Sequence, residues 1–152
     1  MKTVLTYGTF DLFHFGHLRL LQRLAAIGDR VIVGVSTDEF NAGKGKKTII
    51  PFEQRAAIVE NIKGVDLVIP EYSWDQKKLD IEKYHVDIFA MGEDWKGKFD
   101  ELHQYCDVVY LERTKDISST GVKKSLKGLL SISPEELTNA LDILRQIIHD
   151  LE

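Results

Sequence analysis

The sequence predicts an α/β fold: a Rossmann-like, doubly wound sheet of five parallel strands with helices on both faces, plus a C-terminal helix. Short runs rich in valine, isoleucine and leucine alternate with amphipathic stretches, which is the order of repeated strand and helix units. The apolar runs are nearly continuous, so the strands should be buried on both faces, as in a parallel sheet covered by helices. A chain of 152 residues is long enough for one such domain with its own core.

The strands and helices follow one another regularly along the first four fifths of the chain. Strands are expected at residues 3–8, 30–36, 66–70, 86–90 and 107–111. The second helix has Pro51 in its first turn, where the missing N–H of proline costs nothing. Helices are expected at residues 16–27, 51–63, 75–84 and 119–128.

A helical extension at residues 130–152 should follow a domain formed by residues 1–129. Ser133, Pro134 and Glu136 have the spacing of an N-cap, a first-turn proline and a capping-box glutamate. One apolar stripe recurs at helical spacing: Leu137, Leu141, Leu144, Ile147, Ile148 and Leu151. The stripe could pack on the chain's own domain or on another subunit, and both alternatives stay open. A membrane surface is disfavoured because the polar face has no excess of Lys and Arg.

The five segments that follow the strands should meet at one edge of the sheet, because parallel strands all point the same way. Ligands of doubly wound sheets bind outside the carboxyl ends of the strands. The segments are residues 9–17, 37–47, 70–77, 91–98 and 113–120. No Gly-x-Gly-x-x-Gly follows the first strand, so a dinucleotide-binding dehydrogenase is disfavoured.

The first of these segments carries two histidines, His14 and His17, with Gly16 between them. A glycine-ended strand that leads into a helix N-terminus offers free backbone N–H groups and a positive helix dipole to phosphate. The two imidazoles can each donate a hydrogen bond to phosphoryl oxygens, and Gly16 should let the backbone turn sharply close to a ligand. This pattern favours nucleotidyl transfer. A zinc site is weaker, because no other paired ligands occur, and a cap or a solvated pair is the structural alternative.

Basic residues gather in the second segment, although the chain is acidic overall. The net charge of −4 argues against a broad nucleic-acid-binding face. Lys44, Lys46 and Lys47 are interrupted by Gly43 and Gly45, and such a loop could wrap a triphosphate. The alternative is a solvated surface loop.

Composition points to a cytoplasmic enzyme without membrane insertion. No apolar run approaches the roughly 18 residues of a membrane span, and no signal-peptide apolar region follows Met1. The lone Cys106 has no nucleophile motif around it, so a reduced structural thiol is expected.

Three segments together resemble one enzyme family. Residues 7–11 with 14–17 (YGTFD and HFGH) are similar to the signature of the cytidylyltransferase branch of the HxGH nucleotidyltransferases, and residues 113–120 (RTKDISST) resemble its C-terminal Arg-Thr-x-Gly-Ile-Ser-Thr-Thr motif. Residues 91–95 and 97–100 resemble the block of the glycerol-3-phosphate cytidylyltransferases. This resemblance, over about residues 2–129, implies transfer of a cytidylyl group from CTP to glycerol 3-phosphate, giving CDP-glycerol and pyrophosphate.

The resemblance implies roles for several residues. Lys46 would neutralise the triphosphate, while Lys44 and Lys77 would hold the acceptor phosphate. His14 and His17 would stabilise the α- and β-phosphoryl oxygens, best as protonated imidazoles. The residues expected to close on the nucleotide from the C-terminal motif are Arg113, Thr114, Ser118, Ser119 and Thr120. No dedicated protein metal site is expected, and Mg²⁺ would arrive with CTP.

Further residues of the same segments complete the predicted site. Thr9 and Phe10 would supply backbone or hydroxyl contacts, and Asp94 would hydrogen-bond the ribose or base. Asp11 would either hold a magnesium-bound triphosphate or fix the loop before His14. Arg55, on the helix after the lysine loop, would reach the acceptor phosphate.

Two positions depart from the family pattern. Asp116 replaces a glycine of the C-terminal motif and adds a negative charge near the triphosphate. Lys63 stands where relatives commonly have a substrate-binding Arg, and it lacks the bidentate guanidinium. Nucleotide affinity could therefore be weaker than in relatives.

Other functions stay open at this point. One is a nucleotidyltransferase of the same fold that uses another phosphoalcohol or ATP, and another is a CTP-binding module without turnover. The resemblance also implies a homodimer and a product used for teichoic acid or capsule polymers.

Overall fold

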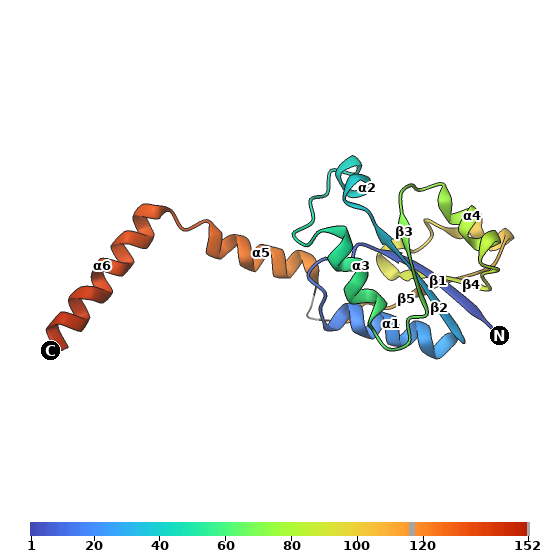
Figure 1. The fold of residues 1–152 in the computed structure, drawn as a ribbon, viewed down its shortest axis with the longest axis horizontal. Coiled ribbons are helices and arrows are strands. Elements are labelled where there is room, and N and C mark those ends of the chain that lie inside the picture. Colours follow the sequence, from blue (N-terminus) through green and yellow to red (C-terminus); the bar gives the residue numbers. More distant parts are fainter. Residues whose placement is uncertain (116–117, 152) are drawn as a thin grey trace. The chain divides into compact units, whose positions relative to one another are not determined.

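The computed structural model describes residues 1–115 and 118–151, and it contains a parallel five-stranded sheet (Figure 1). The strand order is β3-β2-β1-β4-β5, and every neighbouring pair is parallel. The strands are β1 (Thr3–Gly8), β2 (Arg30–Ser36), β3 (Leu67–Glu71), β4 (Ile88–Gly92) and β5 (Asp107–Leu111). The predicted fold class and topology are therefore confirmed.

Two strands begin slightly later than predicted, and in both cases an aspartate explains the shift. The Asp66 carboxylate accepts a hydrogen bond from Val31 N at 2.7 Å, and Asp87 accepts one from Thr3 N at 2.7 Å. Each aspartate thus pairs with the neighbouring strand through its side chain at the entrance to β3 or β4. The strand itself begins at the residue after the aspartate, at Leu67 in β3 and at Ile88 in β4.

The strand order reverses at β1, which lies between β2 and β4. The chain proceeds from β1 outward to β2 and β3, and then crosses over to β4 and β5 on the other side. Such a switch point opens a crevice at the carboxyl ends of the two strands that flank it. The segment with both histidines leaves β1 at this place.

Helices cover both faces of the sheet and bury two apolar clusters. The helices of this part are α1 (Phe15–Ile27), α3 (Phe52–Glu60) and α4 (Gln76–Lys83). On one face, Leu21 and Leu24 of α1 and Val59 of α3 pack with Val4 and Val33 of the sheet. On the other face, Ile81 of α4 packs with the alternate residues of the same strands, such as Leu5 and Ile32. The alternation confirms strands buried on both sides.

Short helices in the connections were not predicted. Helix α2 (Asp38–Gly43) begins after Thr37, whose side-chain oxygen accepts a hydrogen bond from Phe40 N at 3.1 Å. Two 3-10 turns, η1 (Glu93–Trp95) and η2 (Asp100–Gln104), lie between β4 and β5. Elements this short show no helical periodicity in the sequence, so pattern analysis does not find them.

Helices α5 (Ser119–Leu130) and α6 (Pro134–Leu151) follow the sheet. The chain divides into compact units at Met1–Ser119 and Thr120–Glu152, whereas the predicted boundary lies between residues 129 and 130. The capping box of α6 is confirmed: Ser133 N donates to the Glu136 carboxylate at 2.8 Å, and Glu136 N donates to Ser133 Oγ at 3.1 Å. No helix among the described residues is long and apolar enough to cross a membrane.

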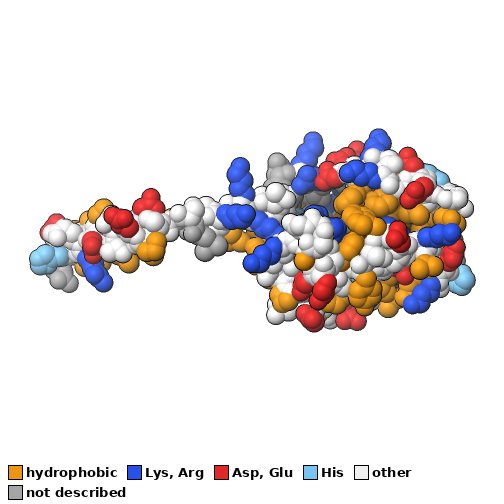
Figure 2. Space-filling view, turned by 90° about the horizontal axis from the view of Figure 1, so that it is seen from above, with side chains coloured by type: hydrophobic (Ala, Val, Ile, Leu, Met, Phe, Trp, Pro, Cys, Tyr) orange, Lys and Arg blue, Asp and Glu red, His pale blue; other side chains and the backbone are white. Residues whose placement is uncertain are grey.

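The side of the first unit seen in Figure 2 carries both basic and acidic side chains. Figure 2 shows Lys and Arg side chains interspersed with Asp and Glu, around an area of hydrophobic side chains. The net charge of −4 agrees with this distribution.

Candidate active site

The histidine pair forms the N-terminal cap of α1. His14 is the N-cap residue, and its Nδ1 accepts a hydrogen bond from Gly16 N at 3.0 Å. His17, three residues later, accepts a hydrogen bond from His14 N on its own Nδ1 at 3.2 Å. The two imidazoles thus form a reciprocal capping box, in which two helix N–H groups that otherwise have no partner are satisfied.

This cap decides which ring nitrogen carries the proton. Because Nδ1 of each imidazole accepts a backbone N–H, the hydrogen of each neutral ring lies on Nε2. The rings are stacked with centroids 3.9 Å apart, so they present two N–H donors side by side. The hypothesis that the pair caps a helix and the hypothesis that it binds a ligand are therefore compatible. Nδ1 of each ring caps the helix, and Nε2 is available to a ligand.

The two Nε2 atoms have different surroundings. His17 Nε2 lies 3.4 Å from Ser119 Oγ, which donates to the Asp11 carbonyl at 2.7 Å. His14 Nε2 is buried and has no hydrogen-bond partner among the described residues. A buried donor without an acceptor is costly, and a phosphoryl oxygen of a bound nucleotide would satisfy it.

Both rings have pKa values below the ordinary value for histidine, which favours neutral imidazoles over the protonated ones expected from the sequence. Burial, followed by the His14 charge, lowers the pKa of His17 to about 4. Burial, followed by the Arg113 charge, lowers the pKa of His14. A second proton would also have to displace a backbone N–H from Nδ1. Both effects favour the neutral form of the two rings.

Unusual backbone angles lie just before the histidines, although not at Gly16. Phe10 has φ 53° and Leu12 has φ 49°, in the left-handed region that costs non-glycine residues energy. Gly16 is the second residue of α1, so the predicted sharp turn occurs at Phe10 and Leu12 instead. The Phe10 ring is buried and lies 5.3 Å from the His17 ring. It supports that imidazole from the side.

Asp11 holds a neighbouring loop. Its carboxylate accepts hydrogen bonds from the backbone N–H groups of Ile49 and Ile50, both at 2.9 Å, and the residue is only 2% exposed. Asp11 therefore fixes the loop at Ile49 and Ile50, whereas the predicted alternatives were a magnesium-bound triphosphate and the loop before His14.

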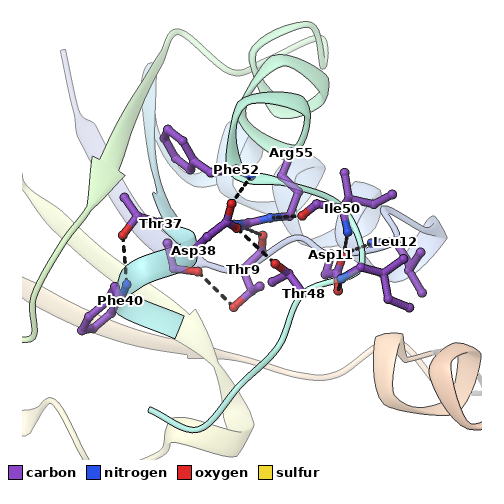
Figure 3. Close-up of polar contacts among 12 residues, drawn as sticks. Thr9, Asp11, Leu12, Thr37, Asp38, Phe40, Thr48, Ile50, Phe52 and Arg55 are labelled. Carbon is purple, nitrogen blue, oxygen red and sulfur yellow. Dashed lines mark hydrogen bonds and ion pairs between the residues drawn. The ribbon is translucent and has the colours of Figure 1, made fainter. Parts of the chain in front are cut away.

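Arg55 requires a correction, because it is buried within the protein and does not reach toward an acceptor phosphate. Its guanidinium donates to Ile50 O at 2.9 Å, to Thr9 O at 2.7 Å and to Asp38 Oδ1 at 2.7 Å (Figure 3). The side chain is 0% exposed. Asp38 also accepts hydrogen bonds from Phe52 N and Thr48 Oγ1, both at 3.1 Å, and the Phe52 contact is the largest cause that lowers the pKa of Asp38.

This cluster was difficult to predict from the sequence, because Arg55 and Asp38 lie on different short helices. An acidic residue in the first turn of α2 was the only signal. Together with Asp11, the pair fixes both ends of the lysine loop, from α2 to the start of α3.

Lys44 and Lys77 come together, as expected, and they meet at a carboxylate that sequence reasoning missed. Glu71, the last residue of β3, places Oε1 3.9 Å from Lys44 Nζ and Oε2 3.5 Å from Lys77 Nζ. Burial lowers the pKa of both lysines and raises the pKa of Glu71. The position of Glu71 at the carboxyl end of a buried strand was the available signal.

Aromatic rings surround the same ammonium groups. Lys44 Nζ lies 4.0 Å from the centre of the Phe40 ring and 5.1 Å from that of Trp74. Trp95 lies 5.8 Å from Trp74 and packs against the core. Trp74 itself is 45% exposed, so it remains accessible to a ligand.

The segments after β4 and β5 contribute charged residues close to His14 and His17, which together are called the histidine corner. Arg113 Nη1 lies 3.6 Å from Asp94 Oδ2, and the Arg113 charge acts on His14. Both side chains of this ion pair are more than half exposed. Thr9 Oγ1 accepts a hydrogen bond from Ser36 Oγ at 3.1 Å at the ends of β1 and β2.

The remaining predicted residues have less definite places. Lys46 is exposed, and its charge acts on Lys44. Thr114 and Ser118 are half-buried, whereas Thr120 belongs to the second compact unit. Asp116 lies outside the described residues.

Lys63 does not join this site within the chain, which is a second correction. It is exposed in the turn between α3 and β3, at the amino end of the sheet. The other predicted residues follow the carboxyl ends of the strands.

Fold and site define a class of enzyme. Two imidazoles follow β1 at the switch point of a doubly wound sheet, and a lysine cluster follows β2 and β3 at the same edge, which suits transfer of a nucleotidyl group between phosphates. A family model described as cytidylyltransferase-like matches residues 5–125. The chain belongs to this family and, within it, to the glycerol-3-phosphate cytidylyltransferases.

The relatives agree over most of the chain. It is 55% identical over 129 residues to a glycerol-3-phosphate cytidylyltransferase from Bacillus spizizenii, covering 85% of this chain and 100% of that protein. It is 54% identical over 128 residues to one from Staphylococcus aureus, covering 84% and 97%. The crystal structure of a lipopolysaccharide core biosynthesis protein from Thermoplasma volcanium matches with a TM-score of 0.66 at 29% identity, covering 76% of this chain and 99% of that one.

Proposed function

We propose that this protein transfers the cytidylyl group of CTP to glycerol 3-phosphate and releases pyrophosphate. The observation that carries the proposal is the 55% identity to a glycerol-3-phosphate cytidylyltransferase across the whole length of that relative. The paired Nε2 donors and the adjacent lysines supply chemistry that this reaction needs.

The reaction needs positioning and charge stabilisation rather than a covalent enzyme intermediate. An oxygen of the acceptor phosphate attacks the α-phosphorus of CTP in line. As this P–O bond forms, the bond from the α-phosphorus to the bridging oxygen of pyrophosphate breaks. The attacking phosphate oxygen carries no proton, so no general base is required.

His14 and His17 donate through Nε2 to the α- and β-phosphoryl oxygens as negative charge develops. Because both rings are fixed by the helix cap, the donors need little reorganisation during the reaction. The buried and unpaired Nε2 of His14 supports this role.

The nucleotide is held by residues from four segments. Lys46 and Arg113 neutralise the triphosphate, and Asp94 hydrogen-bonds the ribose or base. Backbone and hydroxyl groups that complete the nucleotide site come from Thr9, Phe10, Gly16, Thr114, Ser118, Ser119 and Thr120.

Lys44 and Lys77 provide positive charge for the acceptor phosphate. Their ammonium groups face opposite oxygens of the Glu71 carboxylate, so they already lie close to one another. The side chain of Lys44 is 17% exposed and that of Lys77 is 5% exposed, so Lys44 makes the first contact with the incoming phosphate.

Mg²⁺ would enter as the complex with CTP. Among the described residues, no three His, Cys, Asp or Glu side chains gather into a metal-binding group, and the Asp11 carboxylate is occupied by backbone N–H groups. We infer that the triphosphate oxygens and water hold the ion.

A product assay tests the function. Purified protein is given CTP and glycerol 3-phosphate, and both pyrophosphate and CDP-glycerol are measured. Parallel reactions replace CTP by ATP, GTP or UTP and omit the acceptor. CDP-glycerol that depends on both substrates supports the proposal, whereas CTP left intact with every phosphoalcohol offered refutes it.

Assembly and cellular role are finer proposals that rest on the resemblance. We infer a cytoplasmic homodimer whose product is used for teichoic acid or capsule polymers. Light scattering on the full chain tests the dimer.

A further inference from the structure

The ammonium group of Lys77 lies inside an aromatic cage. Its Nζ is 4.5 Å from the centre of the Tyr7 ring, 4.8 Å from that of Trp74 and 5.6 Å from that of Phe99. The Glu71 carboxylate is 3.5 Å away, and Lys77 is only 4% exposed.

The cage is assembled from separate parts of the chain. Tyr7 comes from β1, Glu71 from the end of β3, Trp74 from the connection to α4, and Phe99 from the connection after η1. Tyr7 is held in place because its hydroxyl donates to Asp80 at 2.5 Å, and Phe99 is buried in the core. The walls are therefore fixed independently of Lys77.

Aromatic faces around a cation, completed by a carboxylate, are the arrangement that proteins use to bind quaternary ammonium ligands. In this chain a lysine of the protein fills that place. An external cation would have to displace a charged side chain that has the same sign.

The cage lies next to the acceptor phosphate site. Lys44 contacts the other oxygen of Glu71 at 3.9 Å and shares the Trp74 ring, 5.1 Å from its Nζ. A phosphate bound at Lys44 would thus have the Lys77 ammonium as its neighbour. In choline phosphate, a cation follows the phosphate after only two carbons, so its ammonium would reach the place of Lys77.

We propose that Lys77 is a specificity-determining residue, which occupies a cage suited to cationic alcohols and so excludes choline phosphate and ethanolamine phosphate from the acceptor site. The inference rests on the proposed function of that site. Glycerol 3-phosphate has an uncharged tail and suffers no such repulsion.

Two substitutions separate charge from volume. Lys77→Met keeps the cage filled but removes the charge, and Lys77→Ala also opens the cage. For each variant, kcat/KM is measured with glycerol 3-phosphate, ethanolamine phosphate and choline phosphate. Binding of choline phosphate is measured by calorimetry, so that the result does not depend on turnover alone.

We expect the preference for glycerol 3-phosphate over choline phosphate to fall about 100-fold in Lys77→Ala and about 10-fold in Lys77→Met. Adding Glu71→Gln to Lys77→Ala should weaken choline phosphate binding again, because the cage loses its carboxylate. Lys78→Ala, at the next and exposed lysine of α4, should leave the preference unchanged.

Parallel losses for all acceptors, with the preference unchanged, would overturn the inference. If Lys77→Ala does not fold, as judged by circular dichroism, Lys77→Met decides in the same way. The proposed function fails separately, when the unmodified protein makes no CDP-glycerol, and calorimetry with choline phosphate still tests the cage in that case.

Discussion

The two halves of the candidate site hold their polar groups in different ways. At the histidine corner, backbone N–H groups fix both imidazoles through Nδ1, and the lowered pKa values favour neutral rings. At the lysine side, a carboxylate and aromatic rings surround two buried ammonium groups. The first arrangement provides direction without charge, and the second provides charge that needs a partner. A developing phosphoryl charge suits the former, and a phosphate dianion suits the latter.

The largest effect is expected at the histidine corner. His17→Ala removes one fixed donor, so kcat for CDP-glycerol formation should fall about 10²–10³-fold. His103→Ala, at an exposed position of η2, is the matched control and should keep full activity. Equal kcat for the His17 variant and the unmodified protein would show that the corner does not act on the reacting phosphates.

Arg55→Met tests whether the buried Arg55 guanidinium stabilises the fold around the lysine loop. The substitution leaves the Asp38 carboxylate and two carbonyl oxygens without their donor, so the free energy of unfolding should fall by about 3 kcal/mol. Urea unfolding measures it. Arg145→Met, at an exposed pair with Asp142, should change nothing measurable; a similarly small effect at Arg55 would contradict its structural role.

A pH series distinguishes the neutral histidines from protonated ones. The pKa of His17 falls from about 6.5 in the unfolded chain to about 4 in the fold, so the unfolded state binds more protons between these values. Stability from this group is complete above pH 6.5 and is lost as pH falls toward 4. Between pH 7.5 and 5 the loss should be about 2 kcal/mol. The His17→Ala variant should lack this contribution. If the free energy of unfolding varied with pH equally in the variant and the unmodified protein, the lowered pKa of His17 would be contradicted.

Lys44→Met should act on one substrate. Because the proposed function assigns Lys44 to the acceptor phosphate, KM for glycerol 3-phosphate should rise about tenfold, with KM for CTP little changed. Initial rates with each substrate varied in turn measure both constants. A rise confined to CTP would place Lys44 on the nucleotide instead.

The smallest effect on chemistry is expected from α6, whose described residues include none of the site. Its apolar residues are exposed, among them Leu137, Leu141 and Leu144. The family model ends at residue 125, before this helix begins. Truncation after residue 130 should leave kcat unchanged, and light scattering of both chains tests a subunit contact. An unchanged number of subunits in solution would exclude assembly through α6.

Most elements and the location of the site could be predicted from the sequence. Buried strands have a strong local signal, and the carboxyl ends of parallel strands necessarily share an edge. The capping box at Ser133 and Glu136 is also local, so its spacing alone identified it.

The roles of Asp11, Arg55 and Glu71 could not be predicted, because each depends on a partner far along the chain. Asp11 contacts residues 38 and 39 positions away, and Arg55 contacts Thr9 across 46 positions. From the sequence alone, a charged residue near a motif is predicted to contact a ligand. The fold can show instead that its hydrogen bonds are made to other groups of the protein.

The chain's order of apolar runs and its histidine and lysine motifs determined the fold class, the edge that carries the site and the family. These features depend on local periodicity and on residue identity. Only the tertiary structure decided the state of the imidazoles, the burial of Arg55 and the filling of the aromatic cage by Lys77. Those properties arise when distant segments exclude water together and leave each polar group with the partners that the fold provides.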